Sequence, residues 1–273
     1  MGDVTFDFTG RVAVVFGGTS GINYGIAEAF GRNGARVAVA SRRESNVDAA
    51  LERLRDQGVT ALGRAADVRD SAAVDAVFAE VGAQWGAIDV LVSGAAGNFL
   101  VEGNQLSSNG FKTVVDVDLF GTFHVLQQGF AHLAPGASVI NISAPQASVP
   151  MRYQVHVGAA KAGVDQLTRV LALEWAAHGI RVNAISPGPI EDTDGLVRLS
   201  PDGDSGGATA LKYAPLGRLG TKFDVAQLAM FLASSAASYI SGAVIPCDGG
   251  GAIDSVKPAI EEAGRAMNGR SAR

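Results

Sequence analysis

The sequence predicts a single α/β domain built on a doubly wound parallel sheet, and two patterns support this prediction. Short runs rich in Val, Ile and Ala alternate along the chain with longer runs of helical period. The strand-like runs are apolar at nearly every position, which is typical of strands that helices cover on both faces. Right-handed crossovers join such strands, and we expect about seven of them.

Each element follows from these patterns in chain order. The predicted strands are 11–18, 35–42, 59–68 (the weakest), 88–95, 137–143, 180–187 and 242–250. The predicted helices are 24–34, 44–58, 71–86, a segment around 107–134, a helix after Val155, and 222–234. We assign residues 1–255 to one domain and 256–273 to a C-terminal tail. Ligands bind beyond the carboxyl ends of parallel strands, so the Gly-, Asp- and Ser-rich stretch 191–220 is expected to be a substrate loop.

Composition excludes several classes of function. A net charge of −5 over 273 residues offers no basic surface for nucleic acid or an anionic membrane. The single cysteine, Cys247, cannot form an intramolecular disulfide, and no Cys/His cluster has the spacing of a metal site. No run of 18 apolar residues could cross a bilayer, and the N-terminus does not look like a signal peptide. We therefore expect a soluble cytoplasmic protein with a small-molecule partner.

The stretch VVFGGTSGINYGIAEAF follows the first predicted strand and opens a helix. Glycines there let the backbone approach a pyrophosphate, and the helix N-terminus favours its charge. Gly17 and Gly21 fit this pattern, whereas Asn23 stands at the place of the third glycine. The setting predicts a Rossmann-like dinucleotide site. The residues expected to contact the cofactor in this loop are Gly17, Thr19, Ser20, Gly21 and Asn23.

The end of the second predicted strand indicates which dinucleotide binds. An acidic residue there would bind the ribose of NAD, but the sequence has Arg42 and Arg43. Guanidinium groups suit the extra phosphate of NADP, although two solvated arginines remain an alternative. Asp67 and Val68, after the third strand, are expected to hold the adenine. Asp67 could instead be the N-cap of the helix that follows.

Several motifs resemble those of the short-chain dehydrogenase/reductase family, in the family's order. They are the glycine loop, AADV, SGAAG, KAGVDQLTRVLALEWAAHGIRVNAISPGPI and DGG, and the resemblance spans roughly residues 8–252. Within the family, AAGNF, FKTVVDVDLFGTF, VHVGAAKAGVD and PGPIEDTDGLVRL look most like the 2,4-dienoyl-CoA reductases, especially the peroxisomal type. This resemblance implies an NADP(H) cofactor, an acyl-CoA substrate and a homotetramer.

The family's usual catalytic set is largely replaced in this chain. Val157 occupies the tyrosine place, Ala144 the serine place and Asp118 the asparagine place, so only Lys161 is retained. Valine cannot transfer a proton, which disfavours ketone–alcohol chemistry by the usual route. The resembled peroxisomal reductases use an aspartate, a lysine and an ordered water, which implies Asp118 and Lys161 as catalytic residues. Lys161 is also expected to bind the nicotinamide ribose of the cofactor. Two alternatives stay open: a surface lysine, and an aspartate that serves a helix end or a local salt bridge.

The resemblance also implies further contacts. Ala95, Pro187, Gly188, Ile190 and Thr193 would join the cofactor site, with a backbone group of Ile190 and the Thr193 hydroxyl near the nicotinamide carboxamide. Phe99 would form a wall for the nicotinamide or an acyl chain, although core packing is nearly as plausible. Arg69 and Arg198, together with Arg42, would contact the phosphates of CoA or NADP, although each could equally be a solvated surface arginine.

Other side chains near this stretch are expected to have no catalytic part. Tyr153 is expected to precede the helix, and His156 to point about 100° away from the face of Val157, in a structural or interfacial role. Ser143 has no evident His/Asp partner, which disfavours a hydrolase. The predicted activity is NADPH-dependent reduction of 2,4-dienoyl-CoA to 3-enoyl-CoA. The alternatives are an enoyl thioester reductase and a degenerate, non-enzymatic NADP binder.

Overall fold

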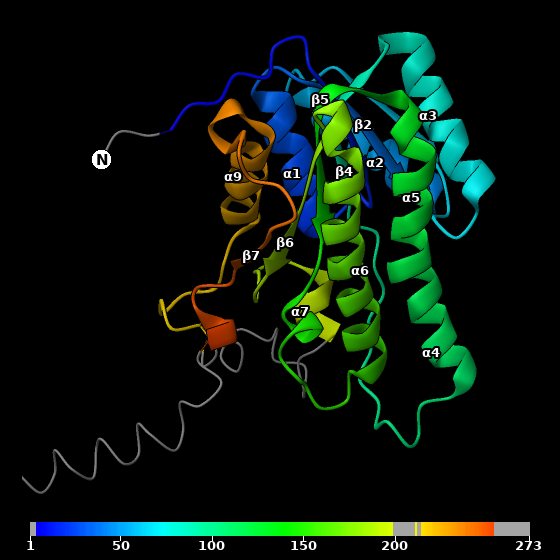
Figure 1. The fold of residues 1–273 in the computed structure, drawn as a ribbon, viewed down its shortest axis with the longest axis vertical. Helices are drawn as coiled ribbons and strands as arrows, with labels where there is room; N and C mark the ends of the chain where they lie inside the picture. The colour runs from blue at the N-terminus through cyan, green and yellow to red at the C-terminus, as the bar shows by residue number, and fades with distance from the viewer. Residues whose placement is uncertain (1–3, 199–210, 212–213, 254–273) are drawn as a thin grey trace, which may run out of the picture.

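The structure is a computed structural model, and it describes residues 4–198, 211 and 214–253. Its centre is a seven-stranded parallel sheet with the order β3-β2-β1-β4-β5-β6-β7 (Figure 1). The strands are β1 Val12–Phe16, β2 Arg36–Ser41, β3 Ala61–Ala65, β4 Ile88–Ser93, β5 Leu133–Ile142, β6 Arg181–Pro187 and β7 Val244–Cys247. The predicted fold class and all seven predicted strands are confirmed.

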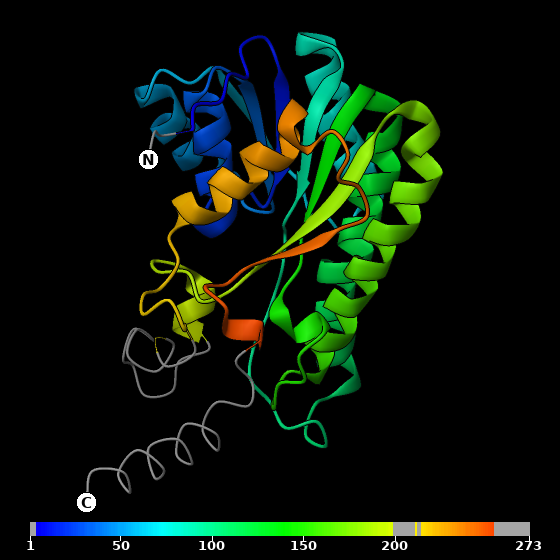
Figure 2. The ribbon, with the colours of Figure 1, turned by 60° about the vertical axis from the view of Figure 1, so that its left-hand side comes forward.

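Helices lie on both faces of the sheet (Figure 2). The α-helices are α1 Gly21–Arg32, α2 Glu44–Asp56, α3 Ser71–Trp85, α4 Ser108–Val115, α5 Gly121–Gly129, α6 Val155–Glu174, α7 Asp194–Arg198 and α9 Lys222–Ala233. Shorter helical turns are η1 Asp116–Phe120, η2 Phe130–His132, η3 Pro145–Ala147, η4 Trp175–His178, η6 Ser235–Ala237 and η7 Gly251–Ile253. In the described residues, no helix has both the length and the apolarity needed to span a membrane.

Two hydrophobic cores explain why the strands are apolar at every position. One core joins the sheet to α1, α2 and α9 and includes Phe30. The other joins the sheet to α3, α5 and α6 and includes Phe78. Successive side chains of a strand point to opposite faces, so Ala13 and Val15 enter the first core while Val14 enters the second. A strand that is polar on one face would lose one of these cores.

The predicted helix around 107–134 is interrupted at a position that matters for function. α4 and α5 are joined by η1, a wider π-helical turn of five residues that includes Asp118. Such turns inside helices are rare and often occur at functional sites. The interruption could not be predicted from the apolar pattern, which continues across it.

The loops after β1 and β4 lie together at the carboxyl ends of the strands. The chain leaves β1 toward β2 on one side and returns as β4 on the other, and Phe16 of β1 pairs with Ser93 of β4. The loops that follow β1 and β4 therefore start side by side, at the switch point where open α/β sheets bind ligands. Of the expected substrate loop 191–220, residues 199–210 and 212–213 lie outside the described part, as do the tail residues 256–273.

Candidate active site

The loop after β1 has the backbone geometry of a phosphate site. Gly17 and Gly21 have positive φ angles of 76° and 56°, which favour glycine. A Cβ on Gly17 would lie 2.9 Å from the backbone nitrogen of Ala95, in the loop after β4. The Ser20 side chain caps none of the N–H groups of the first turn of α1. These donors and the positive end of the helix fit the pyrophosphate of a dinucleotide.

Asn23 joins the loop after β1 to the loop after β4. Its Nδ2 donates a hydrogen bond of 2.7 Å to the backbone oxygen of Gly94. A Cβ on Gly94 would lie 2.3 Å from Asn23 Oδ1, so the asparagine fits only because residue 94 has no side chain. The departure from the glycine pattern at Asn23 therefore has a local partner, and the two loops remain in contact.

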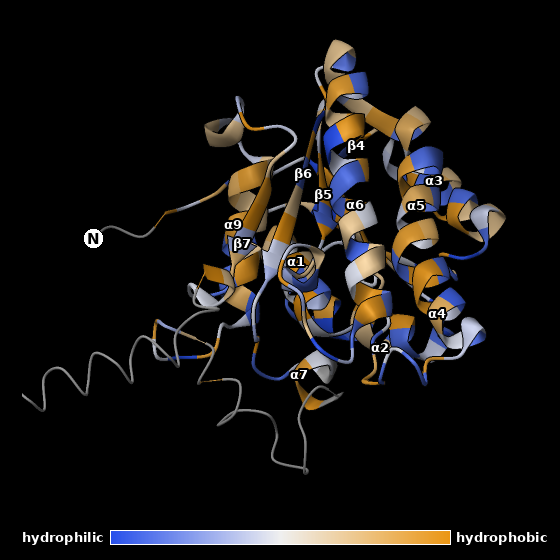
Figure 3. Cartoon of the chain, turned by 60° about the horizontal axis from the view of Figure 1, so that its bottom comes forward, coloured by the Kyte–Doolittle hydropathy of each residue, from blue (hydrophilic) through white to orange (hydrophobic). Residues whose placement is uncertain are grey.

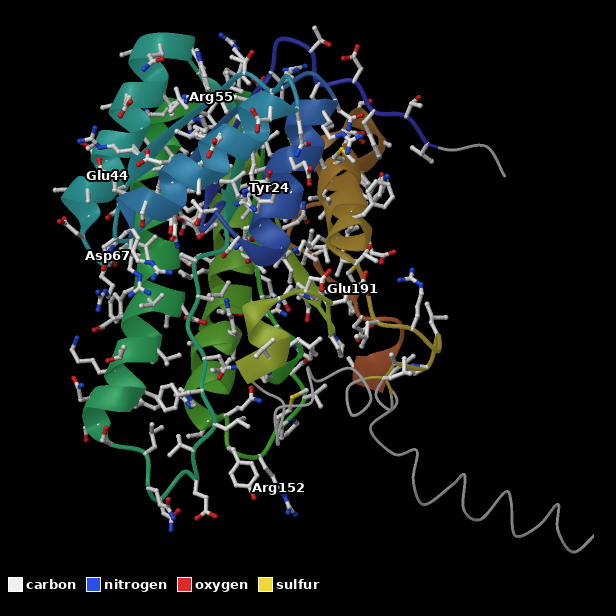
Figure 4. All side chains as sticks on the ribbon, turned by 180° about the vertical axis from the view of Figure 1, so that it is seen from behind. Tyr24, Glu44, Arg55, Asp67, Arg152 and Glu191 are labelled. Carbon is white, nitrogen blue, oxygen red and sulfur yellow. The ribbon has the colours of Figure 1, made fainter. Side chains whose placement is uncertain are left out.

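Arg53 of α2 supports the same loop from another side. Its Nη2 donates to the backbone oxygen of Thr19 over 2.9 Å. Its guanidinium carbon lies 4.0 Å from the ring centroid of Tyr24, a residue of α1 that Figure 4 labels. No motif in the sequence marks Arg53, because its side chain reaches a residue 34 positions earlier in the chain. The loop is thus fixed by contacts from both α2 and β4.

The residues expected at the adenosine end follow β2 and β3. Arg42 and Arg43 are exposed, and Asp67 is labelled in Figure 4 on the same side of the molecule as Glu44, the first residue of α2. Arg69 forms an ion pair with Asp67, with 2.6 Å between Nη2 and Oδ2, and lowers the pKa of that carboxyl. The N-cap of α3 is Asp70, whose side chain accepts two N–H groups of the first turn. The alternative that Asp67 is this N-cap is wrong, and Arg69 is engaged with Asp67.

Asp118 and Lys161 form a buried pair between η1 and α6. Their relative exposures are 1% and 4%, and 3.5 Å separates Lys161 Nζ from Asp118 Oδ2. Nζ also donates to the backbone oxygen of Ile142 over 2.8 Å, while the N–H of Gly97 donates to Asp118 Oδ1 over 2.8 Å. The surface-lysine alternative is therefore wrong. Asp118 does form a salt bridge, and its partner is Lys161.

Burial is the largest influence on the pKa of the two buried carboxyl groups at this site, Asp118 and Asp165. Desolvation raises the pKa of Asp118 above its ordinary value, against the opposing effect of Lys161 and of the Gly97 N–H. Asp165, one turn after Lys161, also has a pKa raised by burial. Its Oδ1 accepts the hydroxyl hydrogen of Ser143, so the expectation that Ser143 lacks an acidic partner is wrong. Both carboxyl groups take up a proton more readily than exposed ones.

The tyrosine position is occupied by an apolar residue, Val157, and the residue before it, His156, is polar. Val157 is buried at 3% exposure, and His156 has no exposed surface. The His156 ring packs against Phe99 with 4.4 Å between centroids, and the charge of Asp118 acts on it. The full burial of His156 and its packing against Phe99, from the loop after β4, fit the structural role that was expected for it. Tyr153 precedes α6, as expected.

The loop after β6 closes over the start of α1. The N–H of Gly188 donates to Cys247 of β7 over 3.0 Å, and a Cβ on Gly188 would lie 2.6 Å from the Cα of Asp248. The Thr193 hydroxyl donates to the backbone oxygen of Ile190 over 2.7 Å. The Thr193 methyl carbon is the nearest atom, at 3.9 Å, to a Cβ placed on Gly21. The predicted nicotinamide loop therefore lies against the predicted pyrophosphate loop.

The remaining expected residues differ in what the structure shows of them. Pro187 ends β6 and is buried. Val68 follows β3 and is buried, and its backbone oxygen lies 2.8 Å from Nδ1 of His124. Arg198 belongs to α7, and its side chain lies outside the described part. Gln154 is a further polar group near the site that no motif in the sequence marks, and its Oε1 accepts hydrogen bonds from Asn98 and Gln146.

Comparison with known proteins agrees with this arrangement. A family model described as Enoyl-(Acyl carrier protein) reductase matches residues 17–251. The peroxisomal 2,4-dienoyl-CoA reductase of Arabidopsis thaliana, named as (3E)-enoyl-CoA-producing, is 39% identical over 96% of this chain and 92% of the relative. A Bacillus subtilis protein named as a probable 2,4-dienoyl-CoA reductase of the (2E)-enoyl-CoA-producing kind is 38% identical, over 88% of this chain and 96% of the relative.

This chain is also similar in fold to a solved short chain dehydrogenase. The short chain dehydrogenase from Bacillus anthracis is 34% identical and superposes with a TM-score of 0.79, over 89% of this chain and 96% of that one. The family model, the two relatives and the solved structure each match most of this chain. The chain therefore belongs to the short-chain dehydrogenase/reductase family, whose members are oxidoreductases that use a nicotinamide cofactor.

Proposed function

We propose that this chain reduces 2,4-dienoyl-CoA thioesters to 3-enoyl-CoA with NADPH. The observation that carries the proposal is the buried Asp118–Lys161 pair beside Val157. Reduction of a ketone needs a proton donor for the new alcohol oxygen, and valine cannot be that donor. Reduction of a conjugated C=C bond forms no alcohol, so a site without the tyrosine can perform it.

Each charged group has a part in this chemistry. NADPH, when bound, supplies a hydride to the far carbon of the diene, and the displaced electron pair moves to the thioester oxygen. Lys161 places positive charge near that oxygen, inside a site where water screens little. Asp118, with its raised pKa, orients a water molecule and passes a proton to the α carbon. The product is then a 3-enoyl thioester, because the α carbon is the one protonated.

The surroundings of Phe99 suit an acyl chain. Phe99 is 38% exposed and lies over His156 next to the pair. Beyond the neighbouring Val155 lies a cavity of about 380 Å³, lined by Gly103, Leu106, Ser107, Ser108, Phe111 and Val155. Its walls are largely apolar, as an acyl chain requires. Arg42, Arg69 and Arg198 remain proposed contacts for the phosphates of the two ligands.

The decisive experiment is a turnover assay with the purified protein. We expect NADPH oxidation with 2,4-dienoyl-CoA across several chain lengths, and a 3-enoyl product by NMR. A 2-enoyl-CoA of the same chain length and a saturated ketone should be reduced much more slowly. Faster reduction of the 2-enoyl-CoA would favour an enoyl thioester reductase, the description carried by the matching family model. Cofactor binding without any turnover would favour the non-enzymatic alternative.

The choice of NADPH over NADH is a second prediction. Arg42→Ala together with Arg43→Ala should raise KM for NADPH about 100-fold or more, since each lost charge-assisted phosphate contact weakens binding by ~1.5 kcal/mol or more. KM for NADH should hardly change. Arg32→Ala, at the far end of α1, removes one positive charge from another exposed position and serves as the control for a nonspecific effect of charge. Equal effects on the two cofactors would contradict the assignment.

A homotetramer is part of the proposal, and an apolar surface supports it. Figure 3 shows orange residues on the outer sides of α4 and α5. The exposed large apolar side chains on α4, η1, α5 and α6 are Phe111, Phe120, Phe123, Val155, Val170 and Leu173. Apolar side chains gathered on one face usually mark a contact between proteins. A cytoplasmic location stays a prediction, because some of the relatives are named as peroxisomal.

A further inference from the structure

Two pairs of buried polar side chains connect the end of β5 to α6. Nδ2 of Asn141 donates a hydrogen bond of 2.9 Å to the hydroxyl of Thr168, and both side chains are fully buried. The hydroxyl of Ser143 donates over 2.5 Å to Oδ1 of Asp165, and these two residues are 3% and 6% exposed. Apolar residues of the same shape would hold a helix on a sheet about as strongly as such pairs do. The pairs are therefore better explained by the geometry that a hydrogen bond imposes.

The Ser143–Asp165 pair lies next to a contact of Lys161. Asp165 follows Lys161 by four residues, so the two side chains lie one turn apart on the same face of α6. Ser143 directly follows Ile142, whose backbone oxygen accepts a hydrogen bond of 2.8 Å from Lys161 Nζ. The sheet holds Ser143 in place, since its N–H donates to the backbone oxygen of Ile185 in β6 over 2.8 Å. Neighbouring residues at the end of β5 thus bind neighbouring turns of α6.

The place of Lys161 depends on how α6 lies along β5. Other buried residues of the helix, such as Ala160 and Val164, are apolar, and apolar packing is not directional. A hydrogen bond between two short side chains is directional, because it weakens steeply with distance and angle. Only 3.5 Å separates Lys161 Nζ from Asp118 Oδ2, so a shift of the helix by about 1 Å would change this ion pair.

We propose that Ser143 and Asp165 are positioning residues, whose hydrogen bond fixes the turn of α6 that carries Lys161 against the end of β5. The inference rests on the proposed function and deepens it, because it identifies what holds the cation in place at a site without the usual tyrosine. In this role neither side chain contacts the substrate or exchanges a proton with it. Their effect reaches the reaction through Lys161, which stays on the Ile142 oxygen and near Asp118.

The titration of Asp118 measures the place of Lys161. The charged groups that act on this carboxyl are Lys161 and His156, and Lys161 lowers its pKa against the larger effect of burial. If Ser143→Ala lets Lys161 move away, the pKa of Asp118 should rise further. Carbon-13 NMR of protein labelled at the aspartate carboxyls follows this titration without any turnover, and Asp118→Asn identifies the resonance. An unchanged titration in Ser143→Ala overturns the proposal.

The Asn141–Thr168 pair supplies a matched control. Thr168→Val removes one buried hydroxyl from the same contact between β5 and α6, two turns after Lys161, as Ser143→Ala does one turn after it. Both variants should lower the Tm by roughly 2–8 °C. Only Ser143→Ala should shift the Asp118 titration and lower kcat with hexa-2,4-dienoyl-CoA, by about 10- to 100-fold. Equal effects of the two variants on kcat and on the titration would show a role in folding alone and overturn the proposal.

Two substitutions at Asp165 test the hydrogen bond itself. Asp165→Asn keeps an oxygen that accepts from Ser143, whereas Asp165→Leu has a similar volume and no acceptor. Asp165→Asn should keep kcat within about threefold, and Asp165→Leu should lose as much as Ser143→Ala. The double variant with Ser143→Ala and Asp165→Leu should lose no more than either single variant, because both break the same contact. Equal losses in Asp165→Asn and Asp165→Leu would assign the effect to the carboxylate charge and overturn the proposal.

The outcomes separate this inference from the proposed function. If the unmodified protein oxidises NADPH with no dienoyl-CoA, the proposed function fails, and the NMR titration still decides whether Ser143 and Asp165 hold Lys161 near Asp118. If the unmodified protein is active and Ser143→Ala matches it in kcat and in the Asp118 titration, only this inference fails. If Ser143→Ala yields no folded protein, the titrations of Asp165→Asn and Asp165→Leu decide, and a rise of the Asp118 pKa is expected in the second alone.

Discussion

Replacement of Lys161 by methionine is expected to lower kcat for dienoyl-CoA reduction by about 100- to 1000-fold. Methionine fills a similar volume but removes the only cation within 4 Å of Asp118 among the described residues. The dienolate oxygen would then form without positive charge nearby, in a site from which water is largely excluded. The measurement is single-turnover NADPH oxidation, because it reports the hydride step apart from product release.

The same substitution has a predictable effect on stability and its pH dependence. Without Lys161, the pKa of Asp118 should rise further, since a cation that stabilised the carboxylate is gone. A carboxyl with a raised pKa in the folded state holds its proton more tightly there than in the unfolded chain. Its contribution to stability is fully present below the unfolded pKa of about 4 and is lost as pH rises through the folded pKa. Lys161→Met should therefore be less stable at neutral pH than at pH 5.

A double variant supplies the control for this pair. Asp118→Asn removes the buried carboxylate, so Lys161→Met with Asp118→Asn should regain stability at neutral pH while staying inactive. Breaking a buried pair from one side typically costs ~3–5 kcal/mol, and removing both charges costs much less. Additive effects of the two substitutions on thermal unfolding would show that the groups do not interact. Full activity of Lys161→Met would remove the proposed mechanism.

The sheet could be predicted because local pattern and global fold agree in it. Strands such as β1, with side chains in both hydrophobic cores, are apolar at every position and differ clearly from amphipathic helices. The interruption at η1 was not predictable, because Asp116–Phe120 continues the apolar period of the helix while its hydrogen bonding changes. Long-range hydrogen bonding decides such details, and periodicity does not record it.

The site could be predicted where a motif fixes a residue, and not where a side chain reaches across the fold. Lys161 and Asp118 stand in recognisable stretches, and the structure brings them together. Helical geometry predicts the direction of His156 around α6, but it does not predict that Phe99 packs against that face. The position of Asp165 could have been predicted to lie near the site, because it is an acidic residue one turn after Lys161 on the same side of α6, a face that is buried in the structure. The position of Arg53 could not.

Gly94→Ala is expected to weaken NADPH binding at least 10-fold and to destabilise the fold by ~1–3 kcal/mol. The new methyl group would lie 2.3–2.5 Å from three atoms of the Asn23 side chain. The amide would have to move, which breaks its hydrogen bond to Gly94 and shifts the start of α1 relative to the loop after β4. Both loops border the proposed cofactor site, so the damage should appear in cofactor affinity as well as in thermal unfolding.

A cycle of variants tests whether Asn23 is the cause. Asn23→Gly restores the glycine pattern, and in that background Gly94→Ala finds space, so the double variant should bind NADPH more tightly than Gly94→Ala alone. Gly82→Ala is the matched control, because Gly82 lies in α3 and a Cβ there would meet its nearest atom, Nδ1 of His132, at an ordinary contact distance of 3.5 Å. Contacting residues give non-additive effects, whereas independent ones add. If Gly94→Ala instead weakens NADPH binding equally whether residue 23 is asparagine or glycine, the strain lies in the backbone and Asn23 does not cause it.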